Sequence, residues 1–378
     1  MPHHNAIKQL SGKTAGASKQ LTTRRRQTAK TRLICAVLTV AILILLIVSG
    51  ATGTVDVSLL EAAQIVTGHL IPNMPWMSDG SLSTLQDQAV WQFRLPRTLL
   101  AGVAGAGLAL AGALMQVTVR NPLAEPYILG VSSGASVGAV LVIVLGSAAL
   151  GGLPLNIAAF LGALCACIAV SLLARKDGTL SPTRMILAGV ALGTLLSAIT
   201  SYLTISTSAQ NVVSVMFFLL GSVSAASLSS VVAPLVALLV SLVVAYMLAR
   251  HLNVLMTGDE SAMSLGVNAT KLRALLLVIA SVLTGTVVAV AGGIGFVGLV
   301  VPHIARIAVG ADHRRMIPVT VLGGMAFLMT ADLLARTIAH PTEVPLGILT
   351  AFVGAPFFLW LMRQGGAEKA GMADEHRI

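Results

Sequence analysis

Three arginines and one aspartate are the residues of this sequence whose types and spacing suggest binding chemistry. Arg94 and Arg97 flank Pro96 just before an apolar run, and Arg336 follows Asp332 by one helical turn. Residues three or four apart lie on the same face of a helix, so Arg94 and Arg97 point the same way and Asp332 can pair with Arg336. Such guanidinium groups either bind an acidic partner or anchor helix ends at an interface. Both interpretations stay open at this point.

Residues for covalent or metal chemistry are not gathered anywhere in the sequence. The eight histidines are scattered, with no pair at metal-ligand spacing inside the apolar runs. Cys35, Cys165 and Cys167 all lie in apolar runs, and we interpret them as small apolar residues. Gly12-Lys13-Thr14 resembles the end of a phosphate-binding loop, but Ile7 occupies the place of its first glycine. We therefore predict no catalytic residues, no metal and no cofactor bound by this chain, so energy for pumping would come from another subunit.

The composition is that of a membrane protein. Of 378 residues, 56% are hydrophobic and 10% are charged, whereas a soluble domain is about 25% charged. The mean hydropathy is +0.90. Lipid offers no partner to backbone N–H and C=O groups, so most of the chain must be helical. The net charge of +10 comes largely from a basic N-terminal stretch and short loops, which indicates an orientation signal rather than nucleic-acid binding.

Apolar runs predict about ten membrane-spanning helices. They cover residues 33–50, 97–119, 127–147, 154–174, 184–204, 231–250, 272–291, 294–309, 316–338 and 345–362. Each is long enough, or nearly so, to cross a bilayer core. A further run at 212–222 is too short and is predicted to lie on the outer surface. The polar stretch 54–93 contains four acids and no Lys or Arg, which favours an outer loop.

Alternating these helices from a cytoplasmic N-terminus places nearly every basic residue inside, as the positive-inside rule requires. Only Arg94, Arg97 and Arg336 fall outside. Both termini are then cytoplasmic. We predict a disordered basic tail at 1–32, a transmembrane domain at 33–364 and a cytoplasmic C-terminal tail at 365–378.

The run from Thr98 to Val119 is rich in Gly and Ala at four-residue spacing, a pattern that lets helix backbones approach closely in lipid. We therefore predict a central helix here. Two prolines, Pro122 and Pro126, predict a break at 121–126 before the next helix.

The inner loop 252–270 is amphipathic. Thr257 to Glu260 offer a helix-capping start, and Gly266 can close a short helix. Such a loop either contacts a cytoplasmic partner or lies as a solvated interfacial helix.

Several long motifs occur in a recognisable order: RLPRTLLAGVAGAGLALAGALMQVTVRNPLAEPYILGVSSGASVG from 94, SPTRMILAGVALG at 181–193, GGIGFVGLVVPHIAR at 292–306, DHRR at 312–315, ADLLAR at 331–336 and EVPLGILTAFVGAPFFLWLM at 343–362. Together they resemble the FecCD-type permeases. These are the membrane subunits of ABC importers for iron–siderophore complexes, haem and vitamin B12. The resemblance covers about residues 33–364.

The resemblance implies an all-α polytopic membrane protein with the type II ABC importer permease architecture. It also implies a second permease subunit, identical or similar, two cytoplasmic ATPase subunits that use ATP, and an extracytoplasmic substrate-binding protein. By the same resemblance, Arg94, Arg97 and Arg336 dock the binding protein. The cytoplasmic gate comprises Asn121, Pro122, Leu123, Ser181, Pro182 and Thr183, and the ATPase coupling segment comprises Gly258, Asp259, Glu260, Ser261, Ala262, Met263, Leu265 and Gly266.

The expected function is transport of a ferric siderophore through the cytoplasmic membrane of a prokaryote, with no catalytic site in this chain. Haem and vitamin B12 are alternative cargoes. A gradient-driven secondary carrier is the alternative of another class, but it would keep carboxylates within the membrane, and Asp332 is the single acid in the predicted spans.

Overall fold

The computed structural model describes the backbone of residues 3–127, 129–176, 178–339 and 342–375, and the side chains within these ranges from 25 to 361 and at 363. The predicted tails, 1–32 and 365–378, extend outside the described backbone at residues 1–2 and 376–378. In chain order the elements are α1 (His3–Ala51), α2 (Leu59–Leu70), η1 (Pro75–Met77), α3 (Thr84–Gln88), the π-helix η2 (Ala89–Arg94), α4 (Leu95–Val119), α5 (Val131–Leu145), η3 (Ala148–Leu150), α6 (Leu155–Leu173), β1 (Arg175–Lys176), β2 (Thr179–Leu180), α7 (Pro182–Ile205), α8 (Ala209–Leu220), α9 (Leu228–Met247), α10 (Ala249–Leu255), α11 (Asp259–Ser264), α12 (Ala269–Ala291), α13 (Val297–Val309), α14 (His313–Thr337) and α15 (Leu346–Glu375).

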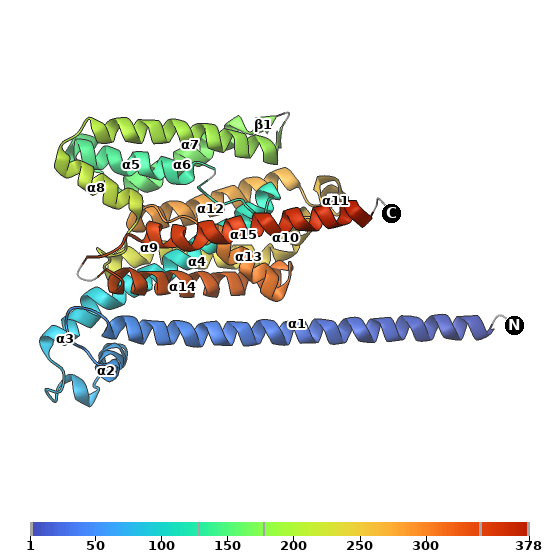
Figure 1. The fold of residues 1–378 in the computed structure, drawn as a ribbon, viewed down its shortest axis with the longest axis horizontal. Coiled ribbons are helices and arrows are strands. Elements are labelled where there is room, and N and C mark those ends of the chain that lie inside the picture. Colours follow the sequence, from blue (N-terminus) through green and yellow to red (C-terminus); the bar gives the residue numbers. More distant parts are fainter. Residues whose placement is uncertain (1–2, 128, 177, 340–341, 376–378) are drawn as a thin grey trace.

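The long helices lie side by side in one bundle, with α7 along one edge and α1 along the other (Figure 1). Helices α2, α3 and α8 lie at one end of the bundle, which we call the α2 end. Helix α11, the short β1–β2 hairpin and both chain termini lie at the opposite end, which we call the α11 end. The fold confirms the predicted all-helical membrane architecture.

Each of the ten predicted runs overlaps a helix. Among the described residues, seven helices are long and apolar enough to cross a membrane. The remaining three runs form the shorter apolar helices α5, α13 and the first part of α15. With 13 residues, α13 is only about 20 Å long, so non-helical chain must complete its crossing. The run predicted to be too short to span is α8, which lies at the α2 end (Figure 1).

Helix α4 is the centre of the bundle, as its small residues predict. Every residue of α4 except Leu99 is buried, and the helix packs against α14, α12, α13 and α9. A β-carbon on Gly105 would overlap the carbonyl oxygen of Gly324 in α14, and one on Gly112 would overlap that of Gly298 in α13. Glycine at these positions therefore lets backbones touch, which is how helices associate without large side chains in lipid.

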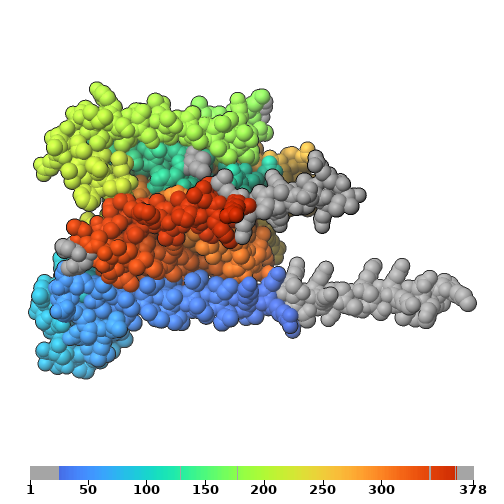
Figure 2. Space-filling model, in the orientation of Figure 1, coloured from blue at the N-terminus to red at the C-terminus, as the bar shows by residue number. Residues whose placement is uncertain are grey.

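Helix α7 has the opposite character. It forms the upper edge of the space-filling view (Figure 2), and its exposed face carries large apolar side chains such as Leu187, Tyr202 and Ile205. An exposed apolar face of this size suits lipid or another subunit rather than water.

The break after α4 is longer than predicted. Helix α5 begins at Val131 rather than near 127, and residues 121–127 and 129–130 form turns and irregular chain. Within this segment the Glu125 carboxylate accepts a hydrogen bond of 3.2 Å from the backbone N–H of Phe296, which directly precedes α13. Phe296 directly precedes α13, which is only about 20 Å long, shorter than a bilayer core. The contact therefore lies inside the bundle rather than at its end. Non-helical chain at membrane depth is tolerated where surrounding protein covers it.

Candidate functional sites

Arg97, Asp332 and Arg336 form a buried cluster between α4 and α14. The Nε of Arg97 donates to Oδ1 of Asp332 at 2.8 Å, and Nη1 of Arg97 donates to Glu343 at 2.7 Å. Nη2 of Arg336 lies 3.3 Å from Oδ2 of Asp332. The side chain of Asp332 is 1% exposed, whereas that of Glu343 is 44% exposed. The predicted pair of Asp332 and Arg336 is confirmed, and Arg97 joins it from another helix.

Arg94 points to a different neighbour. Its guanidinium group donates to the carbonyl oxygens of Gly50, Ala51 and Val55, at 2.9, 3.0 and 2.6 Å. These carbonyls lie at the end of α1 and just after it, where the last turn of a helix leaves C=O groups without partners. Arg94 thus satisfies carbonyl groups at the end of α1, and Asp56 lies near enough to act on its charge.

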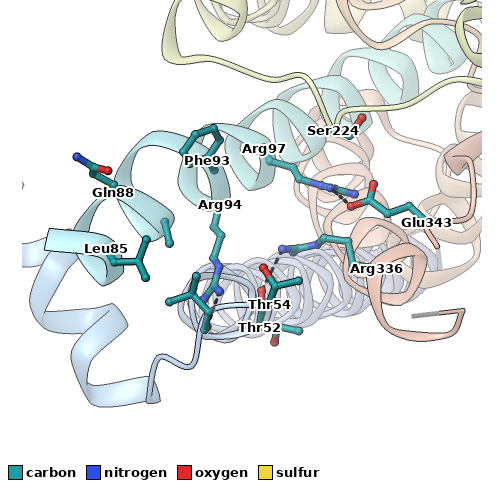
Figure 3. A pocket seen from close by; sticks show the side chains of 13 residues that line it. Thr52, Thr54, Leu85, Gln88, Phe93, Arg94, Arg97, Ser224, Arg336 and Glu343 are labelled. Atoms are coloured by element: carbon teal, nitrogen blue, oxygen red, sulfur yellow. Dashed lines mark hydrogen bonds and ion pairs between the residues drawn. The ribbon is translucent and has the colours of Figure 1, made fainter. Parts of the chain in front are cut away.

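The three arginines line one open pocket of about 340 Å³ at the α2 end, together with Thr54, Ser224, Glu343 and other residues. Figure 3 shows Arg97 and Arg336 reaching toward the same space, with Arg94 turned toward the chain near Thr52 and Thr54. Three guanidinium groups face two carboxylates in and beneath this pocket, so its net charge is positive. The sequence placed these arginines on an exposed rim, whereas the structure places them in the wall and floor of a hollow.

The first predicted gate segment follows α4 at the α11 end. Arg120 ends the helix in the left-handed region, with φ of +51°. The Asn121 side chain then accepts from the N–H of Leu123 at 2.9 Å, and the Asn121 carbonyl accepts from the N–H of Ala124 at 3.1 Å. These bonds make a compact turn that leaves Pro122 exposed.

The second predicted gate segment begins α7. Ser181 precedes the helix, and Pro182 occupies its first position. Proline is well suited to this position because the N–H it lacks would have no helical partner there. Leu180, in β2, immediately precedes the segment and is buried. The two predicted gate segments therefore both lie at helix ends on the α11 side of the bundle.

The predicted coupling segment forms α11. Thr257 does not cap it, contrary to expectation: its hydroxyl bonds back to Val254, and the residue at the cap position is Gly258, which has no side chain to offer. The prediction for Gly266 is confirmed, because this residue has φ of +77° and the N–H of Val267 bonds to the carbonyl of Ala262. Met263 and Leu265 are exposed, whereas Ala262 is buried.

Asp259, the first residue of α11, meets two arginines. Arg273 donates to both of its carboxylate oxygens, at 2.9 and 2.6 Å, and Nη2 of Arg120 lies 3.4 Å away. The hydrogen bonds from Arg273 hold the pKa of Asp259 below its ordinary value, so the carboxylate is ionised at neutral pH. This bidentate arginine–carboxylate geometry is stronger than a single hydrogen bond between neutral groups.

Metal ligands are not gathered in the described part of the chain, where no three His, Cys, Asp or Glu side chains lie close enough to hold an ion.

Comparison with known proteins agrees with this architecture. The family model described as the FecCD transport family matches residues 40–364. The chain belongs to the FecCD transport family. It is a multi-pass membrane permease of the ABC importer type.

Relatives of this FecCD permease include two named import proteins. This chain is 46% identical to the cobalamin import system permease protein of Halobacterium salinarum, and the match covers 72% of this chain and 73% of the relative. It is 40% identical, over 76% of its length and 88% of the relative's, to the hemin transport system permease protein of Yersinia pestis. A solved inward-facing ABC transporter, provisionally assigned to the metal-chelate type, superposes with a TM-score of 0.76 at 32% identity, covering 88% of this chain and 99% of the other.

Sequence reasoning missed three residues that organise these sites in the FecCD permease. Arg273 was interpreted as a topology signal, Glu343 as part of a motif, and Glu125 as part of a break. The sequence signal for Arg273 was its position inside the apolar run 272–291, and the structure shows that it is 1% exposed. A buried arginine requires partners, but the sequence alone does not identify Asp259 as one of them.

Proposed function

We propose that this chain is the membrane permease of an ATP-driven importer that carries a metal chelate, with a ferric siderophore as the expected cargo. The observation that carries the proposal is that the two ends of the bundle carry different kinds of surface. The α2 end has a positively charged pocket, and the α11 end has two short gate segments beside an amphipathic helix.

The pocket supports docking of an extracytoplasmic binding protein through acidic side chains. Its size of about 340 Å³ admits a carboxylate side chain, and within the described residues the Arg94 guanidinium bonds to backbone carbonyls and forms no ion pair with an acid within 4 Å. Electrostatic complementarity of this kind sets orientation and association rate. In this proposal an acid of the binding protein enters the pocket and competes with Glu343 for Arg97.

Helix α11 supports docking of a cytoplasmic ATPase. Met263 and Leu265 give it an exposed apolar face, and the helix is held to the bundle through Asp259 and Ala262. The α11 end is then cytoplasmic, and so are both termini. In this proposal two permease subunits, identical or similar, pair so that their gate segments close a shared path, and each subunit contacts one of the two ATPases.

A gradient-driven carrier is less well supported. Such a carrier uses carboxylates that take up and release an ion within the membrane. Among the described residues, the two carboxylates placed inside the bundle both have structural partners: Asp332 lies between the guanidinium groups of Arg97 and Arg336, and Glu125 accepts the backbone N–H of Phe296. The two guanidinium groups engage Asp332 in a structural ion-pair cluster.

Cobalamin and haem are the second candidates for the cargo. The two relatives named above carry these names at 46% and 40% identity. All three cargoes are large complexes built around a metal, so the importer class does not depend on which one is carried.

The test is uptake into liposomes that contain this chain and its ATPase, with a loaded binding protein added outside. ATP inside is compared with a non-hydrolysable analogue and with an imposed proton gradient, using ferric siderophore, haem and cobalamin in turn. We expect uptake only with hydrolysable ATP and the binding protein together. Uptake driven by the gradient alone would overturn the proposal in favour of a secondary carrier.

A further inference from the structure

Arg273 makes contacts with three different parts of the α11 end. Its guanidinium group holds the Asp259 carboxylate at the start of α11. The Nε donates at 3.0 Å to the carbonyl of Thr118, in the last turn of α4. The Nη1 reaches the carbonyl of Leu180 at 3.5 Å. One side chain thus touches α11 and the chain next to each of the two gate segments.

The position of these contacts is specific. Thr118 lies three residues before Asn121, the first residue of one gate segment, and Leu180 lies directly before Ser181, the first residue of the other. Arg273 is among the largest fully buried side chains of the described chain. A buried guanidinium group bonded on several sides is fixed in place, because losing any partner leaves a charge or carbonyl unsatisfied.

Arg120 adds a second connection to the same carboxylate. It lies between α4 and Asn121, and its Nη2 is 3.4 Å from Asp259. The residue has φ of +51°, which is costly for a side chain larger than glycine. Such strain persists only where surrounding contacts maintain it, and it is concentrated at functional sites.

We propose that Arg273, with Arg120, is a positioning residue that transmits displacement of α11 to both gate segments through the Asp259 carboxylate. The inference rests on the proposed function, in which α11 contacts the ATPase and residues 121–123 and 181–183 form the gate. A movement of α11 that pulls on Asp259 moves Arg273, and with it the ends of α4 and β2. The two gate segments therefore respond together, although 60 residues of sequence separate Asn121 from Ser181.

The inference is tested with the complete complex of permease and ATPase in lipid. Cys35, Cys165 and Cys167 are first replaced by alanine, and a reporter cysteine is placed at Asn121 or, separately, at Ser181. Its labelling by a membrane-impermeant thiol reagent is measured with and without ATP. Arg273→Lys keeps the buried charge but loses the two-pronged bond, and Asp259→Asn removes the charge at nearly constant shape.

Lys271→Gln is the matched control, because it removes a cation from the same helix. The side chain of Lys271 is exposed and forms no ion pair within the residues that the structure describes. Each variant is also checked for co-purification with the ATPase and for ATP hydrolysis.

We expect the ATP-dependent change in labelling to fall about tenfold at both reporter positions in Arg273→Lys and in Asp259→Asn, and ATPase association and hydrolysis to persist in Arg273→Lys, which lies outside the coupling segment. The double variant should be no worse than either single one, because both remove the same link. Arg120→Gln, at a half-exposed site, should weaken the response at Asn121 more than at Ser181.

An unchanged ATP response in folded Arg273→Lys and Asp259→Asn complexes, or an equal loss in Lys271→Gln, would overturn the inference and leave the proposed function intact. If the parent chain itself shows no ATP response at either reporter, the proposed gate is wrong, and the inference fails with it. The parent measurement therefore separates the two failures.

Discussion

Glu125 and Phe296 lie 171 residues apart, and the carboxylate of one accepts the backbone N–H of the other at 3.2 Å. Their contact joins the two non-helical stretches that precede α5 and α13. Phe296 has φ of +67°, an uncommon conformation for an aromatic residue. The carboxylate satisfies an N–H that would otherwise be left without a partner inside the bundle.

Replacing Glu125 should therefore lower the free energy of unfolding, and the loss should depend on whether the new side chain can still accept a hydrogen bond from the Phe296 N–H. Glu125→Ala leaves the Phe296 N–H unpaired and should lower the free energy of unfolding by about 1–3 kcal/mol. Glu125→Gln keeps an oxygen at nearly the same place and should cost less. Unfolding in mixed micelles, followed by tryptophan fluorescence, measures both. Equal stability of Glu125→Ala and the parent chain would contradict this role.

The cluster beneath the arginine pocket makes a second prediction. Arg97→Met removes one of the two cations that hold Asp332, whose side chain is 1% exposed, and should cost about 3–5 kcal/mol. Glu343→Gln alters the exposed partner of the same arginine and should cost about 0–1 kcal/mol. The amount of folded protein extracted from the membrane and its thermal midpoint report the difference. An equal loss of stability in both variants would contradict the expectation that burial of the paired carboxylate sets the cost of removing its partner.

Charge in the pocket can be tested without disturbing that cluster. Thr54 lines the pocket and is exposed, so Thr54→Asp introduces a negative charge at little structural cost. If the pocket docks an acidic partner, affinity for the binding protein should fall about tenfold at low salt and recover partly at high salt. Thr54→Asn has nearly the same size and separates charge from shape. Binding to the permease in nanodiscs gives the affinity, and equal affinities for the two variants would remove support for docking here.

Gly266 allows a test of the end of α11. A β-carbon there would meet open space, but φ of +77° disfavours any L side chain. Gly266→Ala should cost about 1–2 kcal/mol of local stability through backbone strain, and Gly266→Asn less, because Asn tolerates this region. We expect ATPase stimulation by substrate to fall in the order parent, Asn, Ala. The opposite order would show that the left-handed turn is not what α11 requires.

Close glycine contacts give a final prediction. Gly105→Leu places a side chain against the carbonyl of Gly324 and should abolish folded protein. Gly295→Ala is the matched control, since a β-carbon there would meet nothing within 4 Å and its φ is not positive. Expression and monodispersity of the purified chain distinguish the two. Normal folding of Gly105→Leu would require α4 and α14 to separate more easily than their contact suggests.

The sequence was most informative where local patterns decide structure. The Gly and Ala spacing around Gly105 predicted the central helix, because small residues at one face are themselves the cause of close packing. The turn at Gly266 was likewise predictable, since few residues other than glycine adopt its conformation readily. These features depend on a few neighbouring residues, and the structure confirms both.

Pairings between distant residues were not predictable. Arg97 meets Asp332 across 235 positions, and nothing near either residue encodes the other. The start of α5 was misplaced because an apolar run does not distinguish a helix from extended chain that protein covers on all sides. The arginines of the pocket were predicted to form a charged rim. Their exposure depends on which helices surround Arg94 and Arg97, and the sequence near these residues does not show that.

The tight enclosure of α4 also limits how this permease can change shape. Where glycine backbones already touch at Gly105 and Gly112, sliding α4 by a fraction of a turn would drive atoms into one another. Around Gly105 and Gly112, helices α4, α13 and α14 are therefore expected to move together. Any change of shape is then expected at the thinly packed periphery, where α1 and α7 are the least buried of the long apolar helices.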